Sequence, residues 1–161
     1  MGRSRRQVPA GCIAVNRKAN LRYDITDRYE AGLVLRGSEV KSLRAGQVDI
    51  SEAYAAVERG ELWLRHMYIA SFFAARAFPH AERGSRKLLL HAREIRDIDR
   101  AISREGYTVI ALDVHFKDGR AKVTLGLGRG RKDHDKRAVL LERTLERETL
   151  KATQTRRQRP A

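Results

Sequence analysis

The segment Tyr107–Gly130, YTVIALDVHFKDGRAKVTLGLGRG, decides the fold. Its two apolar stretches, Tyr107–Phe116 and Ala121–Leu127, each alternate between apolar and polar residues, and they flank the tetrapeptide Lys117–Arg120. Alternation with a period of two is typical of strands that bury one face, and the Asp-Gly pair inside the tetrapeptide favours a tight turn. The segment therefore predicts an antiparallel β-hairpin.

Shorter apolar runs, separated by turn residues, predict the other strands of the body. We expect a strand at Tyr29–Leu35, in which Gly32 marks a bulge or a point of close approach. Ala53–Val57 and Leu62–Tyr68 flank a turn that contains Gly60 and predict a second hairpin.

Helices are predicted at three places. Ser38–Leu43 begins with a good N-cap residue, and Ser85 can cap a helix over Arg86–His91. A further helix is expected where isoleucines recur at three and four residues, and it ends at a glycine: Ile95, Ile98, Ile102 and Gly106. The segment between the second hairpin and these helices, Ser71–Gly84, is predicted to be a loop.

About six short strands with two or three small helices predict a mainly β protein with small helices. The fold class we expect is an OB-like closed β-barrel of about six strands with flanking short helices, which commonly binds oligonucleotides. Because both ends lack the apolar content for a core, we expect a flexible basic arm at 1–12 and a barrel at 13–128. Residues 129–161 are expected to be a basic C-terminal tail that is disordered in the free protein.

The charge of the chain gathers at its two ends. The net charge is +14, of which residues 1–22 carry +6 and residues 129–161 carry another +6. The intervening residues carry 17 cations and 15 acids and are nearly neutral. In GLGRGRKDHDKR, Gly126–Arg137, glycines alternate with cations, which lets a backbone approach a phosphate chain closely. This distribution predicts a protein that binds nucleic acid, and RNA in particular.

The composition argues against several other classes of protein. No run approaches the ~18 apolar residues of a membrane span, and the N-terminus lacks the apolar stretch of a signal peptide. Cys12 is the single cysteine, which fits a reducing cytoplasm, and the five histidines lack metal-ligand spacing. The acidic residues are spread along the chain instead of clustered for catalysis, so we expect no metal, no cofactor and no enzymatic activity.

Five motifs make the chain resemble a known family. They are NRKA (16–19), EAGLVLRGSEVKSLRAGQ (30–47), RKLLLHAREI (86–95), REGYTVIAL (104–112) and KDHDKR (132–137). In this order and spacing they resemble the small protein B (SmpB) family, the tmRNA-binding proteins of bacterial trans-translation. The resemblance covers about three quarters of the chain, and we know no other family with this set of motifs.

The resemblance implies a function and its partners. It implies that the protein binds the tRNA-like domain of tmRNA and delivers it to stalled ribosomes, with the tail helical in the empty mRNA channel and decoding centre. The implied partners are tmRNA, the small-subunit rRNA and, through the charged tmRNA, elongation factor Tu. A cytoplasmic location and an OB-like barrel follow from the same resemblance.

The resemblance also assigns site residues. The implied RNA-binding positions are Asn16, Arg17, Lys18, Glu30, Leu89, Lys122, Arg129, Arg131 and Lys132. The implied decoding-centre positions are His134, Asp135, Lys136 and Arg137. The chain departs from the family pattern after NRKA, where Leu21 and Asp24 replace a histidine and an apolar residue.

Each assigned residue also has an ordinary structural interpretation. Asn16 would otherwise be a turn residue, Glu30 a solvated strand charge and Leu89 a core residue. Two alternative functions stay open: a general RNA chaperone or ribosomal protein on the same barrel, and a nuclease. A general RNA chaperone or ribosomal protein would share the basic ends, but it would not explain the motifs EVKSLRAG and RKLLL. A nuclease would need clustered acidic residues, which this sequence lacks.

Overall fold

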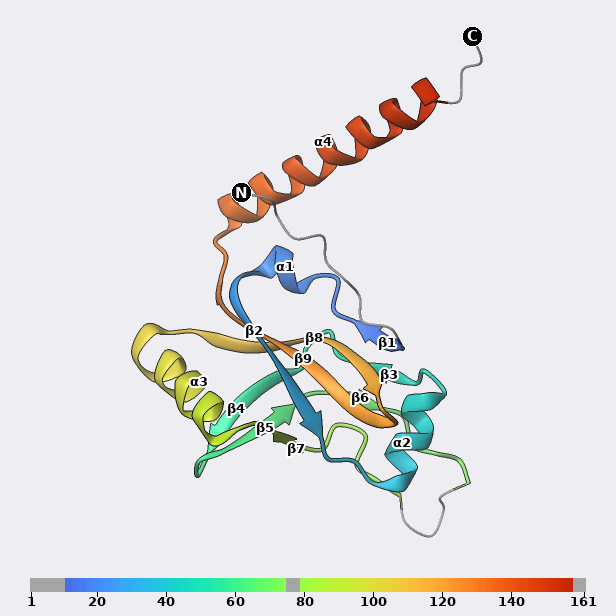
Figure 1. Cartoon of the computed structure of the whole chain (residues 1–161), viewed down its shortest axis with the longest axis vertical. Helices are drawn as coiled ribbons and strands as arrows, with labels where there is room; N and C mark the ends of the chain where they lie inside the picture. Colours follow the sequence, from blue (N-terminus) through green and yellow to red (C-terminus); the bar gives the residue numbers. More distant parts are fainter. Residues whose placement is uncertain (1–10, 75–78, 158–161) are drawn as a thin grey trace.

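The computed structural model describes residues 11–74 and 79–157, which form nine strands and four helices. The strands are β1 Cys12–Val15, β2 Tyr23–Leu33, β3 Val48–Asp49, β4 Tyr54–Glu58, β5 Glu61–Arg65, β6 Tyr68–Ile69, β7 Arg86–Leu89, β8 Thr108–Lys117 and β9 Arg120–Gly130. The helices are α1 Ala19–Arg22, α2 Gly37–Arg44, α3 Ala92–Glu105 and α4 Asp133–Arg157. The predicted mainly β architecture with helices is confirmed, although α4 is far longer than the small helices expected (Figure 1).

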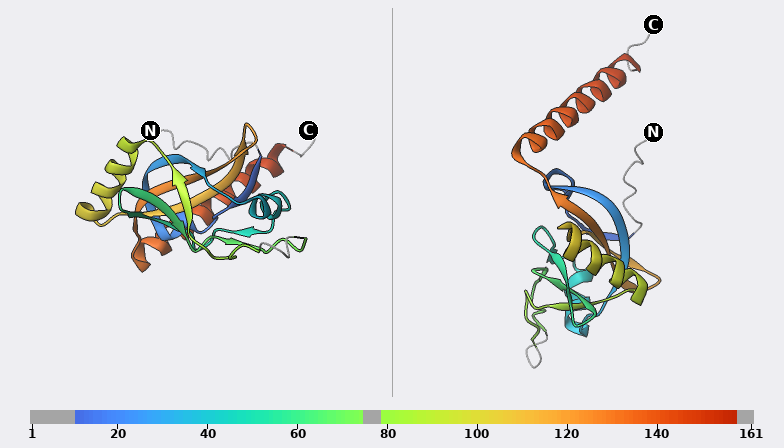
Figure 2. Two further views of the ribbon diagram at one scale, coloured as in Figure 1. Left: turned by 90° about the horizontal axis from the view of Figure 1, so that it is seen from below. Right: turned by 90° about the vertical axis from the view of Figure 1, so that its left-hand side faces the viewer.

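Six antiparallel strands pair in a closed circuit. The order β8-β4-β5-β7-β2-β9 returns to its start because β9 also pairs with β8, while β1 adds to β8, and β3 and β6 form a separate pair. The long strands β2, β8 and β9 run across the body in Figure 1, and α2 and α3 lie at opposite ends of the sheet in both Figure 1 and Figure 2. The circuit leaves no unpaired edge along most of the ring.

The hydrophobic core lies inside this circuit. Every strand of the ring contributes apolar side chains, and α2 and α3 add one fully buried apolar residue each. The large side chains that the ring, α2 and α3 bury completely include Leu43, Leu62, Leu64, Leu88, Ile98, Val109, Val123 and Leu125. Burying each such side chain contributes about 1.5–3 kcal/mol, so the ring is stabilised by its own interior.

Most elements predicted from periodicity are confirmed. The hairpin β8–β9 turns at Asp118 and Gly119, whose positive φ angles of 52° and 73° suit a two-residue primed turn. The hairpin β4–β5, the helix α2 and the isoleucine-bearing helix α3, which ends before Gly106, also form. The predicted strand at Tyr29–Leu35 exists as β2, but it begins at Tyr23 and ends at Leu33.

The helix predicted over Arg86–His91 is wrong, because Arg86–Leu89 is strand β7. Arg86 and Leu88 are buried while Lys87 and Leu89 face outward, which is the two-residue period of a strand. β7 pairs with β5 on one side and with β2 on the other, so it completes the ring. A four-residue segment does not reveal such distant pairing partners.

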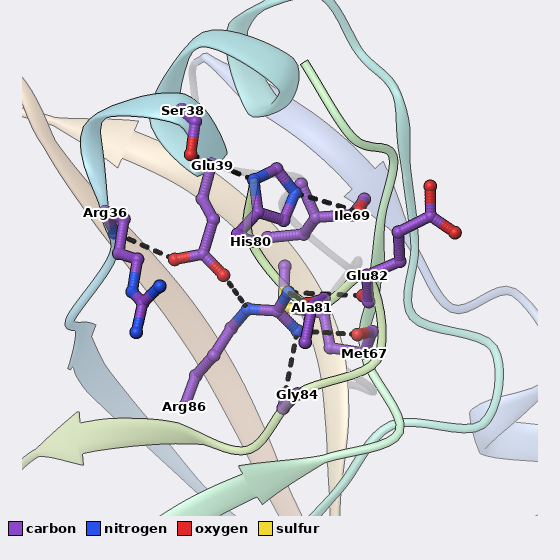
Figure 3. A network of polar contacts seen from close by, with 10 residues as sticks. All are labelled: Arg36, Ser38, Glu39, Met67, Ile69, His80, Ala81, Glu82, Gly84 and Arg86. Carbon is purple, nitrogen blue, oxygen red and sulfur yellow. Dashed lines mark hydrogen bonds and ion pairs between the residues drawn. The ribbon is translucent and has the colours of Figure 1, made fainter. Parts of the chain in front are cut away.

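A buried ion pair fixes the start of β7 (Figure 3). The Arg86 guanidinium donates to Glu39 Oε1 at 2.8 Å, and both side chains are almost fully buried. Arg86 also donates to the carbonyls of Met67, Ala81, Glu82 and Gly84. The second carboxylate oxygen of Glu39 accepts from the Arg36 backbone N–H at the start of α2.

His80 joins the same region to α2. Its Nδ1 lies 3.0 Å from the Ser38 hydroxyl, and its Nε2 lies 3.2 Å from the Ile69 carbonyl oxygen. Together these contacts tie α2, β6, β7 and the preceding loop into one unit (Figure 3).

Replacing Arg86 by methionine should lower the free energy of unfolding by about 3–5 kcal/mol, because Glu39 keeps a buried charge without its partner. Urea unfolding followed by circular dichroism measures this loss. Lys87→Met is the matched control on the same strand, since its ion pair with Glu61 is partly exposed to solvent and should contribute less than about 1 kcal/mol. Equal losses for the two variants would show that the Arg86 network does not stabilise the ring.

Candidate nucleic-acid interface

Three residues assigned to RNA from the sequence meet on one outward surface of the ring. Gly32 of β2 pairs with Leu89 of β7 on one side and with Lys122 of β9 on the other, and Glu30 lies two residues along β2. Their neighbours Ala31, Leu88 and Val123 are buried, which directs this set outward. We call Glu30, Gly32, Leu89 and Lys122 the Gly32 surface; the buried His115 of β8 pairs with Lys122 and supports it.

Leu89 is an exposed apolar side chain on this surface, beside Gly32. It follows the fully buried Leu88 and is itself 55% exposed, so the interpretation of Leu89 as a core residue is wrong. A Cβ at position 32 would lie 3.2 Å from Leu89 Cβ, so the glycine lets the leucine lie flat across β2. The close approach expected at Gly32 is thereby confirmed, whereas the bulge of β2 lies between Ile25 and Asp27.

Glu30 is held by neighbours instead of projecting freely into solvent. Its Oε1 accepts from Lys117 Nζ at 3.0 Å, and its Oε2 lies 3.4 Å from His115 Nε2. The Lys117 hydrogen bond, with the charges of Lys117 and His115, holds the pKa of Glu30 below its ordinary value. The carboxylate is therefore charged and fixed in position at neutral pH.

His115 is fixed in turn from the other side. Its Nδ1 lies 2.8 Å from Asp113 Oδ1, which also accepts from the Thr124 hydroxyl at 2.9 Å. His115 and Asp113 are both buried, so the chain Thr124–Asp113–His115–Glu30 links the ring wall to the exposed carboxylate. The sequence analysis missed this chain, although Asp113, His115 and Lys117 recur with the two-residue period of one strand face.

A second group of assigned cations lies where α1 meets the end of β9. Arg17, Lys18 and Lys132 are exposed, and the Arg129 guanidinium lies 4.7 Å from the centre of the Tyr107 ring. We call this group, with Arg131, the α1 surface; the Arg131 backbone N–H donates to the Arg22 carbonyl at 2.7 Å. Lys122 and Arg129 are seven residues apart on β9, so these two residues lie about 23 Å apart along the strand.

Arg131 is partly neutralised by the chain itself. Its guanidinium donates to Asp24 Oδ1 and to the Tyr23 carbonyl, each at 3.3 Å. Asp24, which departs from the family pattern, therefore orients a cation at the base of the tail. Leu21, the other departure, is half-buried in α1.

Asn16 belongs to neither surface and is 8% exposed. Its amide nitrogen lies 3.2–3.4 Å from the carbonyls of Ile50, Ser51 and Ala111, so it links three segments of backbone. The residue also lines an open pocket of about 320 Å³ together with Arg22, Tyr23 and Tyr54. Asn16 thus has a clear structural role, and any contact with RNA would pass through this pocket.

The assigned decoding-centre residues occupy the first two turns of α4. His134 and Arg137 are exposed, His134 Nε2 lies 3.2 Å from Asp135 Oδ1, and Lys136 donates to Asp133. α4 projects away from the body in Figures 1 and 2, so these residues lie at the point where the helix leaves it. Residues 1–10 and 158–161, the outer parts of the predicted arm and tail, lie outside the described residues; Cys12 is already in β1.

Across residues 11–74 and 79–157, no group of His, Cys, Asp or Glu residues is arranged to hold a metal ion. In the same part of the chain, no helix combines the length and apolar character needed to cross a membrane.

The Glu30 carboxyl should titrate below its ordinary pKa of 4.5. Because the folded pKa is lowered, the pairing stabilises the folded state above about pH 4.5 and is lost as the pH falls through the folded pKa. Lys117→Met should raise the midpoint toward 4.5, whereas Lys41→Met should leave it unchanged. NMR titration of the Glu30 side chain measures this, and a midpoint at or above 4.5 in the parent protein would contradict the assignment.

Comparisons with known proteins identify the family. The family model described as "SmpB protein" matches residues 13–155. The chain is 52% identical over 136 residues to the "SsrA-binding protein" of Sorangium cellulosum (strain So ce56), covering 84% of this chain and 83% of that relative. It is 50% identical over 137 residues to the protein of the same name from Sinorhizobium fredii (strain NBRC 101917 / NGR234), covering 84% and 86%.

A solved structure described as "tmRNA-SmpB: a journey to the center of the bacterial ribosome" is also similar. Its TM-score is 0.63 at 43% sequence identity, covering 77% of this chain and 87% of that chain. The predicted family resemblance is confirmed, and the chain belongs to the SmpB protein family.

Proposed function

We propose that this chain binds the tRNA-like domain of tmRNA (SsrA) and takes it to stalled ribosomes in trans-translation. The observation that carries the proposal is the meeting of Glu30, Leu89 and Lys122, from three separate strands, on the Gly32 surface. The names of the relatives, "SsrA-binding protein", support the same RNA. As a member of this family the chain is an RNA-binding protein and not an enzyme.

The Gly32 surface offers three complementary contacts to folded RNA. Lys122 supplies a cation for a phosphate, and Leu89 supplies an apolar plate against a base or ribose. Glu30 supplies a fixed acceptor for a ribose hydroxyl or a base amine, and Lys117 and His115 hold its orientation. A carboxylate at a polyanion surface is acceptable here because these neighbours offset its charge.

The α1 surface supplies cations that neutralise the phosphate backbone of the RNA. Arg17, Lys18 and Lys132 are exposed cations, and Arg129 is kept flat by Tyr107, which leaves its edge free for a phosphate. Arg131 shares its charge with Asp24, so it orients the start of the tail more than it adds charge. Asn16 would reach RNA only through the adjoining pocket.

The finer description of the fold is part of the proposal: the six-strand circuit is an OB-like closed barrel. The continuous pairing of β8, β4, β5, β7, β2 and β9 and the core enclosed by them support it. In this description the domains are an arm at 1–12, a barrel at 13–128 and a tail at 129–161.

The tail is proposed to be disordered in the free protein and helical on the ribosome. Along α4 the leucines 140, 141, 145 and 150 are 48–64% exposed, so the helix buries no apolar face on the body. A helix without such packing is marginal in water. On the ribosome His134, Asp135, Lys136 and Arg137 would occupy the decoding centre, and the rest of α4 would follow the small-subunit rRNA of the empty mRNA channel.

Two further statements follow from this function and not from the geometry. Elongation factor Tu is proposed as a partner through the charged tmRNA, and a cytoplasmic location is proposed because ribosomes stall there.

Leu89→Ala and Lys122→Gln should each weaken binding of the tRNA-like domain about tenfold and leave the unfolding transition unchanged, because both side chains face outward. Filter binding at fixed salt, with circular dichroism alongside, measures both effects. Leu89→Met should retain affinity, and Arg83→Gln is the charge-matched control. Asn16→Ala is unsuitable here because it removes hydrogen bonds from buried carbonyls and should lower stability.

Measuring the affinity for an unrelated structured RNA of equal length distinguishes a tmRNA-binding protein from a general RNA chaperone. Equal affinity for both RNAs would favour a general RNA chaperone, and unchanged affinity of both Gly32-surface variants would remove that surface from the proposal.

Deleting residues 138–161 should separate RNA binding from ribosome rescue. Because the deleted segment buries no core, the free energy of unfolding should barely change, and affinity for isolated tmRNA should fall only modestly. Peptidyl transfer to tmRNA on ribosomes halted at a message end should nevertheless collapse, and alanine at His134, Asp135, Lys136 and Arg137 should act similarly. A truncated protein that rescues at the full-length rate would show that the tail is an inert extension.

A further inference from the structure

The outer face of α3 carries four arginines, which we call the arginine ridge: Arg93, Arg96, Arg100 and Arg104. All four are exposed. At about 3.6 residues per turn they fall within a sector of roughly 80° on the helix. The opposite side of the helix holds Ile95, Ile98 and Ile102, which pack on the core. The ridge therefore points directly away from the body.

This arrangement of charge is unfavourable for the helix alone. Neighbours along the ridge are three or four residues apart, where like charges repel. Arg93 also lies in the first turn, where the helix dipole disfavours a cation. Among the described residues the ridge makes one ion pair, Arg100 with Asp97, at the long distance of 3.9 Å. Glu94 accepts from the His91 backbone N–H and caps the helix.

The ridge begins beside the Gly32 surface. Leu89 ends β7, and α3 starts three residues later at Ala92. Figures 1 and 2 show α3 at the end of the sheet opposite α2, well away from α4. The ridge is thus separate from the tail and from the α1 surface, but it is continuous in sequence with the residue proposed to touch a base.

We infer that the arginine ridge binds the phosphate backbone of the RNA that lies on the Gly32 surface, extending that surface along α3. The inference rests on the proposed function. Eleven residues separate Arg93 from Arg104, so the ridge is about 16 Å long and can follow several successive phosphates. Guanidinium groups suit this partner because each can donate two parallel hydrogen bonds to one phosphate. A membrane surface fits less well, since the apolar side of α3 is already buried.

The test compares the full-length protein with Arg96→Gln/Arg100→Gln, in which glutamine preserves helix propensity. Binding to the tRNA-like domain of tmRNA is measured from 50 to 300 mM salt. Affinity at 150 mM salt should fall about tenfold, and the slope of log K against log salt should become shallower by about 1.5. Asp97→Asn, which removes the acid beside the ridge, should tighten binding about twofold.

Lys41→Gln/Arg83→Gln is the control with the same change of charge on the α2 side of the molecule, and it should change affinity less than twofold. If Arg96→Gln/Arg100→Gln behaves like this control while Lys122→Gln still weakens binding, the ridge is a solvated helix face. That result would overturn this inference and leave the proposed function standing. If Lys122→Gln and Leu89→Ala are also without effect, the proposed function has failed with it. Circular dichroism of each variant confirms that α3 and the ring are intact.

Discussion

The buried contact between Arg86 and Glu39 is the constraint on which much of the structure depends. It seats the first residue of β7, and β7 is the strand that joins β5 to β2 and completes the ring. The same guanidinium binds three backbone carbonyls of the segment before β7 and the carbonyl of Met67, which would otherwise lack these donors. Leu89 ends β7 and α3 begins three residues later, so the strand that this ion pair seats (Figure 3) also helps to position the Gly32 surface and the start of the arginine ridge.

Elements with a clear period and local punctuation could be predicted from the sequence. The β8–β9 hairpin has two alternating strands around Asp118-Gly119, and α3 has isoleucines on one face with Gly106 after it. β7 could not be predicted in this way. Its four residues fit either a helix turn or a strand, and Ser85 favoured the helix. Only pairing with β2 and β5, distant in the chain, selects the strand.

The candidate site shows a similar division. The family motifs identified Glu30, Leu89 and Lys122, and the ring brings them together. The motifs could not show that the amide of Asn16 is engaged by carbonyls up to 95 residues away. They also could not show that Asp24 pairs with Arg131 across 107 residues. Such contacts depend on tertiary pairing, whereas the period of Asp113, His115 and Lys117 was visible in the sequence and was overlooked.

The near-neutral body gains its cationic surfaces through the placement of its acids. Residues 23–128 carry 17 cations and 15 acids, but Glu39 and Asp113 are buried against an arginine and a histidine. Glu30 is bound by Lys117, and Glu94 caps α3. Acids that pair with buried groups, bind a neighbouring lysine or cap a helix do not offset the outward arginines of α3. Asp97, Asp99 and Glu105 remain exposed on α3, so the charge of the arginine ridge is partly offset along the helix itself. An RNA that approaches the ridge is still attracted by the arginines nearest to it, because electrostatic attraction depends on where charges lie as well as on their sum.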